Sequence, residues 1–297
     1  MLRRAALALG ALALIGSGAF WALTRPDPLP AAAFAGISGD PEAGEAVFWA
    51  GGCASCHAAE GARDDDLRIL SGGRGFVSDF GTFRAPNISP DPTHGIGDWT
   101  LPEFANAMLR GVSPEGRHYY PAFPYAAYRL AAPQDIADLY AFLQTLPASD
   151  RPDDPHELRF PFTLRRGIGL WKRLMLPEGW AVAGDLTETE ARGRYLAEAL
   201  AHCAECHTPR GPLGGLDRDR WMAGAANPSG PGRIPGITPA QLTWTESEIA
   251  GYLASGFTPS FDTAGGTMAP VVRSLSRLPQ DDLRAIAAYL KRVPEAR

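Results

Sequence analysis

The sequence predicts an all-α protein in which two tandem helical domains follow an N-terminal transmembrane helix. Three observations predict this class. An uncharged apolar run opens the chain, two later segments repeat the same motifs in the same order, and apolar residues in both recur at helical spacing. The hydrophobic content of 45% and charged content of 21% are those of ordinary globular proteins. A net charge of −5 without a long basic run gives no attraction for nucleic acid, so we expect no nucleic-acid partner.

The first element is the uncharged run at residues 5–24, which follows Arg3 and Arg4. A helix of this length spans about 30 Å, the thickness of a bilayer core. The two arginines favour a cytoplasmic N-terminus, which puts the remainder of the chain on the exported side. A cleaved signal peptide is the alternative, but its apolar core usually has only about 7–15 residues. We therefore predict residues 1–24 to be an uncleaved membrane anchor.

Two proline-rich stretches divide the rest of the chain. We predict residues 25–40 to be a tether and residues 149–186 to be a linker. The remaining parts, residues 41–148 and 187–297, share one order of features: C-x-x-C-H, then N-I-S-P or G-I-T-P, then W-T-x-x-E, then a loop and a final amphipathic segment. We predict these two parts to be copies of one small helical domain.

A capping box predicts a helix start in the middle of each half. Thr100 with Glu103, and Thr245 with Glu248, fit the pattern in which a threonine side chain and a glutamate three residues later satisfy the first amides of a helix. Each box directly follows a tryptophan. The sequence therefore predicts helices that begin at residues 101 and 246.

The last segment of each half is predicted to be a helix because its apolar residues recur every three or four positions. They are Ile136, Leu139, Tyr140 and Leu143 in the first half, and Leu283, Ile286, Ala287 and Leu290 in the second. Gly44 and Gly193 precede the two C-x-x-C-H motifs by similar distances. A glycine lets two helices approach closely, so we expect each to lie where the first helix of its half crosses the last.

Each half opens with the motif C-x-x-C-H, formed by Cys53, Cys56 and His57 and by Cys203, Cys206 and His207. Two cysteines at this spacing lie on one side of a helical turn and can bond both vinyl groups of one porphyrin. The histidine that follows then faces the iron as its proximal ligand. Its other ring nitrogen is expected to donate to a main-chain carbonyl. The motifs predict two covalently bound haem c groups, each with an iron ion.

Other roles of these four cysteines explain the repeated C-x-x-C-H motif less completely than haem attachment does. A thioredoxin-like redox pair needs a βαβ context, which the sequence does not indicate. Two disulfides would leave the histidine after each pair unexplained. A shared zinc site would require the two halves to bring their cysteines together, and such a site does not need an adjoining histidine.

With these motifs in order, residues from about 41 to 294 resemble the multihaem cytochrome c subunits of bacterial membrane-bound alcohol, aldehyde and gluconate dehydrogenases. The resemblance implies two tandem cytochrome c domains that pass electrons toward quinone or an oxidase. Those subunits typically carry three haems, whereas this chain has motifs for two. It is closer to related membrane-anchored diheme cytochromes c. The implied location is the bacterial inner membrane, with the haem domains in the periplasm.

Met268 is the predicted distal ligand of the second iron. It lies in a loop framed by glycines and Pro270, directly before the final helix, where the family places its methionine. Met268 follows Trp244 by 24 residues, and the same step from Trp99 leads to Phe123. A phenylalanine cannot bind iron, so the first haem lacks the matching ligand.

Three alternatives remain for the distal face of the first haem. His118, five residues before Phe123, is a candidate iron ligand, and its other possible role is a hydrogen bond to a propionate or to the main chain. The second alternative is a five-coordinate iron with Phe123 packed over an open face. The third is Met108, which looks like a core residue of the helix after Thr100. We predict that the remaining histidines, His94, His156 and His202, are exposed or structural residues of linkers and turns.

A basic amphipathic segment lies in the linker at residues 163–175 and contains Arg165, Arg166, Lys172 and Arg173. Contact with anionic lipid or with a partner is one interpretation. The favoured interpretation is structural, because linkers usually pack against the domains that they join.

The predicted function is electron transfer without catalysis, between a dehydrogenase or other electron donor and a cytochrome or oxidase acceptor. The alternative is a haem enzyme or ligand sensor that uses an open distal site on the first haem. In that case His118, Tyr119 and Tyr120 are the candidates for a catalytic base.

Overall fold

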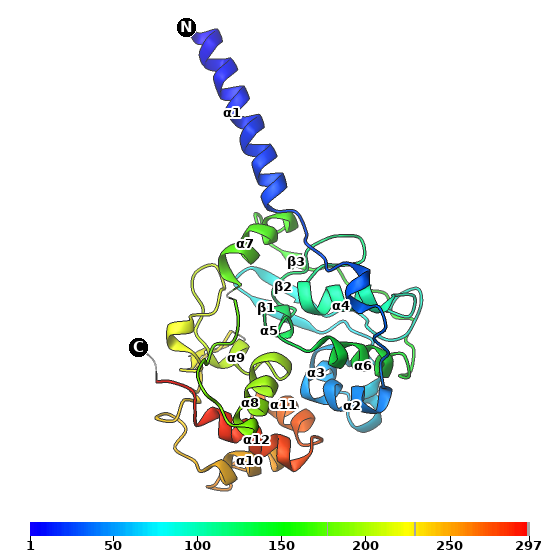
Figure 1. Cartoon of the computed structure of the whole chain (residues 1–297), viewed down its shortest axis with the longest axis vertical. Helices are drawn as coiled ribbons and strands as arrows, with labels where there is room; N and C mark the ends of the chain where they lie inside the picture. The colour runs from blue at the N-terminus through cyan, green and yellow to red at the C-terminus, as the bar shows by residue number, and fades with distance from the viewer. Residues whose placement is uncertain (177, 229, 296–297) are drawn as a thin grey trace.

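The computed structural model describes residues 1–176, 178–228 and 230–295. Its body consists mainly of short helices, and α1 (Leu2–Leu23) projects from it (Figure 1). The first half contains α2 (Pro41–Ala50), α3 (Cys53–His57), α4 (Leu101–Arg110), α5 (Tyr125–Tyr128) and α6 (Pro133–Leu143). The second half contains α8 (Glu188–Arg194), the π-helical segment η4 (Tyr195–Leu200), α9 (Ala204–His207), α10 (Glu246–Ser255), α11 (Met268–Leu275) and α12 (Gln280–Leu290).

Helix α7 (Ile168–Met175) lies in the predicted linker. Four short 3-10 helices complete the helical structure: η1 (Ala31–Phe34), η2 (Asp64–Arg68), η3 (Arg165–Gly167) and η5 (Arg218–Arg220). The predicted tether and linker therefore both contain regular structure. The linker also packs on the first half, because the Asn87 side chain donates to the main-chain oxygens of Ser149 at 2.8 Å and Arg151 at 2.9 Å.

The fold is mostly helical, but it also contains short strands that the all-α prediction missed. β1 (Gly75–Ser78) and β2 (Gly81–Arg84) form a hairpin in which Gly75 faces Arg84, and β3 (Glu157–Leu158) joins it antiparallel to β2. β4 (Ala225–Ala226) pairs with β5 (Arg233–Ile234) in the second half. None of these five strands exceeds four residues, too few for an alternating pattern to stand out in the sequence.

Helix α1 has the length and composition of a membrane span. It has 22 residues, a mean hydropathy of 1.9 and no buried residue. No other helix in the described part of the chain meets the same criteria. The apolar run predicted to cross the bilayer is thus a continuous helix whose side chains point outward on all sides.

Both halves are built around the same close crossing of their first and last helices. A Cβ atom on Gly44 of α2 would lie 2.0 Å from the carbonyl oxygen of Asp138 on α6. A Cβ atom on Gly193 of α8 would lie 1.8 Å from the carbonyl oxygen of Ala285 on α12. Any side chain would separate these helices, so the prediction for both glycines is confirmed.

The predicted helix starts are also confirmed. α4 begins after Thr100 and α10 after Thr245, each with both hydrogen bonds of a capping box. A third capping box, which was not predicted, joins Thr187 to Glu190 at the start of α8.

The two halves contact each other in a reciprocal way. α5 of the first half packs on η4 of the second, while α11 of the second half packs on α2 and α3 of the first. The Tyr195 hydroxyl donates to Asp135 at 2.5 Å and accepts the main-chain N–H of Ala132 at 3.0 Å. The Arg277 guanidinium lies 4.1 Å from the centre of the Trp49 ring. Buried residues of both halves form one continuous hydrophobic core.

Candidate functional site

The four cysteines of the C-x-x-C-H motifs lie on α3 and at the start of α9. Cys53, Cys56, Cys203 and Cys206 are all free thiols. Burial raises the pKa of Cys53 and of Cys203 to about 12, so both thiols are uncharged. Within the described ranges, no group of three or more His, Cys, Asp or Glu side chains could hold a metal ion.

The two motif histidines make matching hydrogen bonds. His57 Nδ1 lies 2.8 Å from the carbonyl oxygen of Pro86, and His207 Nδ1 lies 2.7 Å from that of Pro235. A carbonyl only accepts, so each Nδ1 carries the hydrogen and each Nε2 keeps its lone pair. Burial lowers the pKa of both rings, which favours the neutral imidazole that binds iron. The expected main-chain acceptor is confirmed in both halves.

Pro86 and Pro235 supply the carbonyl acceptors of the two motif histidines and were not predicted from the sequence. Each directly precedes the repeated segment N-I-S-P or G-I-T-P, and that repetition was the available signal. The carbonyl of each motif histidine is bound as well: it accepts the N–H of Gly72 in the first half and of Gly224 in the second, both at 2.7 Å. The same loop that carries the proline carbonyl therefore begins beside the histidine in both halves.

The loop after α4 and the loop after α10, here called the distal loops, can be aligned with each other by their β-bridges. Val112 pairs with His118 in an isolated β-bridge, and Phe257 pairs with Thr263 in another. Both pairs are offset by 145 residues, the same offset that relates Phe123 to Met268. The loops after α4 and α10 thus have one conformation.

The residues that follow this shared turn differ in chemistry. Met268 is half-buried and begins α11. The Phe123 ring packs against three tyrosines, with centroid distances of 5.8 Å to Tyr119, 6.3 Å to Tyr125 and 5.8 Å to Tyr128. Met108, the third alternative for the first iron, is a buried core residue of α4, as its pattern suggested.

His118 has a partner that the sequence did not predict. Its buried ring donates from Nε2 to the main-chain oxygen of Thr24, at the end of α1, over 2.9 Å. A Cβ atom on Gly169 of α7 would lie only 2.8 Å from the same nitrogen. The nitrogen that commonly binds haem iron is occupied by this contact. This contact gives His118 a structural role at the end of α1, in place of the predicted role as an iron ligand.

The two haem-attachment turns are linked through Tyr128. Its hydroxyl donates to the carbonyl of Gly51, two residues before Cys53, over 3.0 Å. Its ring packs edge-on against His202, which directly precedes Cys203, with centroids 5.6 Å apart. One side chain therefore touches the start of both turns.

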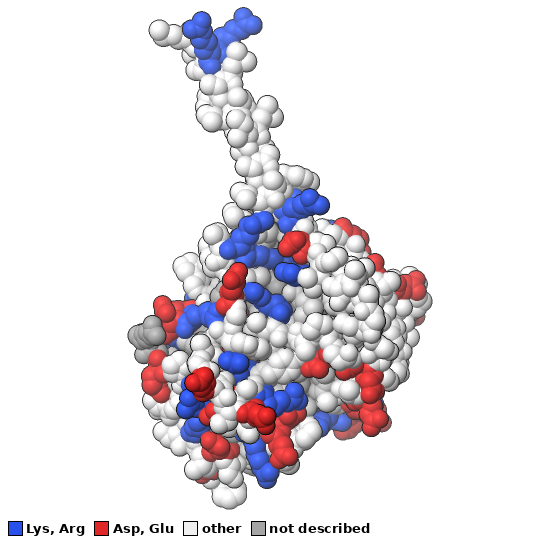
Figure 2. Space-filling view, viewed as in Figure 1, with Lys and Arg blue, Asp and Glu red and all other residues white. Residues whose placement is uncertain are grey.

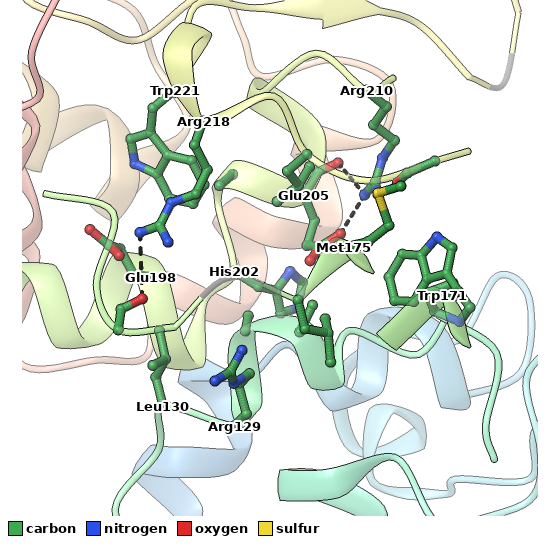
Figure 3. A pocket seen from close by; sticks show the side chains of 18 residues that line it. Arg129, Leu130, Trp171, Met175, Glu198, His202, Glu205, Arg210, Arg218 and Trp221 are labelled. Carbon is green, nitrogen blue, oxygen red and sulfur yellow. Dashed lines mark hydrogen bonds and ion pairs between the residues drawn. The ribbon is translucent and has the colours of Figure 1, made fainter. Parts of the chain in front are cut away.

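A cleft between the halves adjoins the second turn (Figure 3). Arg210 pairs with Glu205 at its edge, and Trp171 and Met175 of α7 form part of its wall. His202 also lines it. None of the predicted iron ligands or attachment cysteines is among the described residues that line this cleft.

Comparison with known proteins identifies the family. A family model described as Cytochrome c matches residues 41–147 and, separately, residues 190–294. The chain belongs to the cytochrome c family.

Three relatives show which members of this family the chain is similar to. This cytochrome is 57% identical over 293 residues to the "Diheme cytochrome c-type" of Cereibacter sphaeroides, with 99% of both chains covered. It is 37% identical to the "Fructose dehydrogenase cytochrome subunit" of Gluconobacter japonicus, over 82% of this chain and 50% of that protein. It is 32% identical to the "Alcohol dehydrogenase (quinone), cytochrome c subunit" of Gluconobacter oxydans, over 84% of this chain and 54% of that protein. The cytochrome thus spans the whole of its diheme relative but about half of the dehydrogenase subunits.

The cytochrome carries two covalently bound haem c groups, since each half matches the family and a full-length relative is diheme. The residues present fit these groups. Each half offers two free thiols on one helical turn and a neutral histidine whose Nε2 keeps its lone pair.

Proposed function

We propose that this cytochrome relays single electrons from a membrane-associated dehydrogenase, or from another quinol-side donor, to a periplasmic or oxidase acceptor. When bound, each haem supplies a one-electron iron couple. The observation that carries the proposal is the contact of Tyr128 with the starts of both attachment turns. A chain that holds two attachment sites side by side is suited to passing electrons within one molecule.

The proposed attachment residues are Cys53 and Cys56 in the first half and Cys203 and Cys206 in the second. The proposed proximal ligands are His57 and His207, and the proposed distal ligand of the second half is Met268. Pro86 and Pro235 hold the two histidine rings through the hydrogen bonds to Nδ1. The first half offers Phe123 where the second offers methionine.

The proposed location is the bacterial inner membrane, with α1 as a permanent anchor and both haem domains in the periplasm. The hydropathy and exposure of α1 support the span, and Arg3 and Arg4 support a cytoplasmic N-terminus. The dehydrogenase donor is proposed from the names of the relatives that serve fructose and alcohol dehydrogenases.

The test is to delete the gene in its host and to measure oxygen uptake by isolated membranes supplied with a sugar, an alcohol, an aldehyde or gluconate. We expect uptake to fall for at least one substrate and to recover with the wild-type chain. A chain with Cys203→Ser and Cys206→Ser, which can attach only one haem, should not restore it. If uptake is unchanged for every substrate, the dehydrogenase is not the donor.

A second candidate function is ligand binding or catalysis at the first haem. One observation favours it: Phe123 stands at the position of Met268 and offers no atom that binds iron. The test is carbon monoxide binding by the reduced protein. Binding at one haem would support an accessible first iron, and absence of binding would remove the basis of this candidate.

A further inference from the structure

The end of α1 is surrounded by a surface that is both basic and apolar. We define the juxtamembrane surface as the exposed or half-exposed residues Phe160, Phe162, Leu164, Arg165, Arg166, Leu170, Arg173 and Leu174. All of them lie in the predicted linker, on or directly before α7. None of these residues is among the proposed iron ligands or attachment cysteines.

Two side chains of the body bind Thr24 at the end of α1. Thr24 is fully buried, and its carbonyl accepts a hydrogen bond from His118 at 2.9 Å. Its hydroxyl accepts another from Arg166 Nε, also at 2.9 Å. Gly169 permits this approach, because a Cβ atom there would lie 2.5 Å from the Thr24 carbonyl oxygen. The end of α1 is therefore fixed to the body.

Arginines of η3 and α7 satisfy the last carbonyls of α1. Arg166 Nη2 donates to the Trp21 oxygen at 2.7 Å, and Arg173 Nε donates to the Leu23 oxygen at 2.6 Å. Cations at a helix C-terminus also complement its partial negative charge. These bonds connect α7 to the last turn of α1, so α7 lies at the level where α1 leaves the bilayer.

Trp21 indicates which part of α1 lies at the headgroup layer of the membrane. Trp21 is 66% exposed, and the Arg166 guanidinium lies 4.1 Å from the centre of its ring. Tryptophan is enriched at the headgroup layer of membranes, where its ring meets both apolar chains and water. A headgroup layer at Trp21 would also contain Arg166, which contacts it directly.

The apolar residues of the juxtamembrane surface are unusually exposed for a body in water. Phe160 is 80% exposed, Leu164 60% and Leu174 65%. They share this segment with Arg165, Arg166 and Arg173, and Figure 2 shows Lys and Arg gathered around the base of α1. Apolar side chains that reach into the acyl boundary beside cations that meet phosphates are typical of an interfacial membrane contact.

We propose that the juxtamembrane surface binds the bilayer through anionic phospholipid headgroups and holds the haem domains in one orientation. This inference rests on the proposed membrane span of α1. The observation that selects a membrane over a protein as the occupant is continuity: the same arginines bind the last turn of α1. In this orientation the second half, with α10 and α12, points away from the membrane (Figure 1).

The test is hydrogen exchange of the full-length, haem-loaded protein in lipid nanodiscs. One set contains phosphatidylcholine alone, and a second contains added phosphatidylglycerol. We expect amides of residues 160–175 to exchange about tenfold more slowly in the anionic discs, because contacts of the arginines with anionic headgroups oppose local opening of this segment. Amides of the loop at residues 256–264, in the second half, should exchange equally in both.

Matched variants separate this contact from general effects. The double variant Leu164→Asn, Leu174→Asn should lose the slower exchange. Phe261→Asn is the control, since Phe261 is 88% exposed in the second half and its φ of 63° suits asparagine. The Phe261→Asn protein should retain the slower exchange of residues 160–175.

The outcomes distinguish this inference from the proposed anchor. If the protein fails to remain with either disc, α1 is not an anchor and both proposals are overturned. If α1 is protected but residues 160–175 exchange alike in both discs and in detergent, the anchor stands and the membrane contact is wrong. Protection that requires an added acidic protein would also overturn it, in favour of a protein partner.

Discussion

Phe123 and Met268 occupy the same position in the two halves, each five residues after the residue that closes a β-bridge, His118 or Thr263. The main-chain bonds beside these bridges match as well. The N–H of Tyr119 donates to Gly111 and that of Ala264 donates to Gly256, both at 2.8 Å. The two distal loops therefore share their backbone and differ in the side chain that they offer. We expect the two haems to differ in reduction potential for this reason.

Phe123→Met should give the first half a sulfur ligand. We expect the reduction potential of the first haem to rise toward that of the second and any carbon monoxide binding to disappear, because methionine ligation fills the distal position. Potentiometric titration and carbon monoxide difference spectra measure both effects.

The reciprocal variant, Met268→Phe, is the control. It should remove the methionine signature from the absorption and EPR spectra and lower the potential of the second haem. An unchanged spectrum would show that Met268 is not an iron ligand.

Gly44→Ala should destabilise the fold. A Cβ atom would lie 2.0 Å from the Asp138 carbonyl oxygen, so α2 and α6 must move apart, at a cost of about 2 kcal/mol or more in the free energy of unfolding. Gly251→Ala in α10 is the matched control, because a Cβ atom there meets nothing within 4 Å. It should stabilise the protein by up to about 1 kcal/mol. Denaturant unfolding of both variants measures these free energies. Equal changes in the two variants would contradict the close crossing of α2 and α6.

Local signals allowed much of the fold to be predicted from the sequence. The capping boxes at Thr100 and Thr245 and the glycines at 44 and 193 act within one helix or one crossing, and the structure confirms all four. The strands were not predicted because each is at most four residues long and because β3 comes from the linker, 73 or more residues from β2. Pairing over such a separation leaves no local pattern.

In the candidate site, too, the short-range features could be predicted and the distant partners could not. The motif histidines and their need for a carbonyl acceptor follow from short-range chemistry, but Pro86 and Pro235 are brought there by the fold. The partner of His118 lies 94 residues away at the end of α1, and no spacing rule relates the two. The contact of Tyr128 with His202 depends likewise on how the halves pack.

Glu198→Ala should destabilise the second half. The buried Glu198 carboxylate accepts the N–H groups of Ala181 at 2.7 Å and Val182 at 3.2 Å, and also the Tyr289 hydroxyl. Removal leaves these donors without their acceptor, at a cost of about 3 kcal/mol in unfolding free energy. Glu60→Ala, at an exposed position, should change it by less than about 0.5 kcal/mol. Thermal unfolding of both variants tests this, and a loss no greater than that of Glu60→Ala would contradict the role.

His156 should make the first half sensitive to acid. Its Nδ1 accepts the N–H of Arg84 at 3.1 Å, and burial, aided by Arg165, lowers its pKa below the ordinary 6.5. The unfolded chain therefore takes up the proton first, so stability is complete above pH 6.5 and declines as the pH falls below it.

His156→Gln keeps an acceptor but does not titrate. We expect its unfolding free energy to fall less steeply than that of the wild type between pH 6.5 and pH 5. Denaturant unfolding at several pH values measures the slopes, and parallel slopes would show that His156 does not carry the effect.

In the proposed arrangement, one chain holds two haems side by side with unlike distal faces. The most direct test is a potentiometric titration of the purified full-length protein followed by absorption and EPR spectroscopy. We predict two reversible one-electron steps at different potentials, with the spectral signature of methionine ligation on one haem only. Two coincident steps with methionine ligation on both haems would contradict this arrangement.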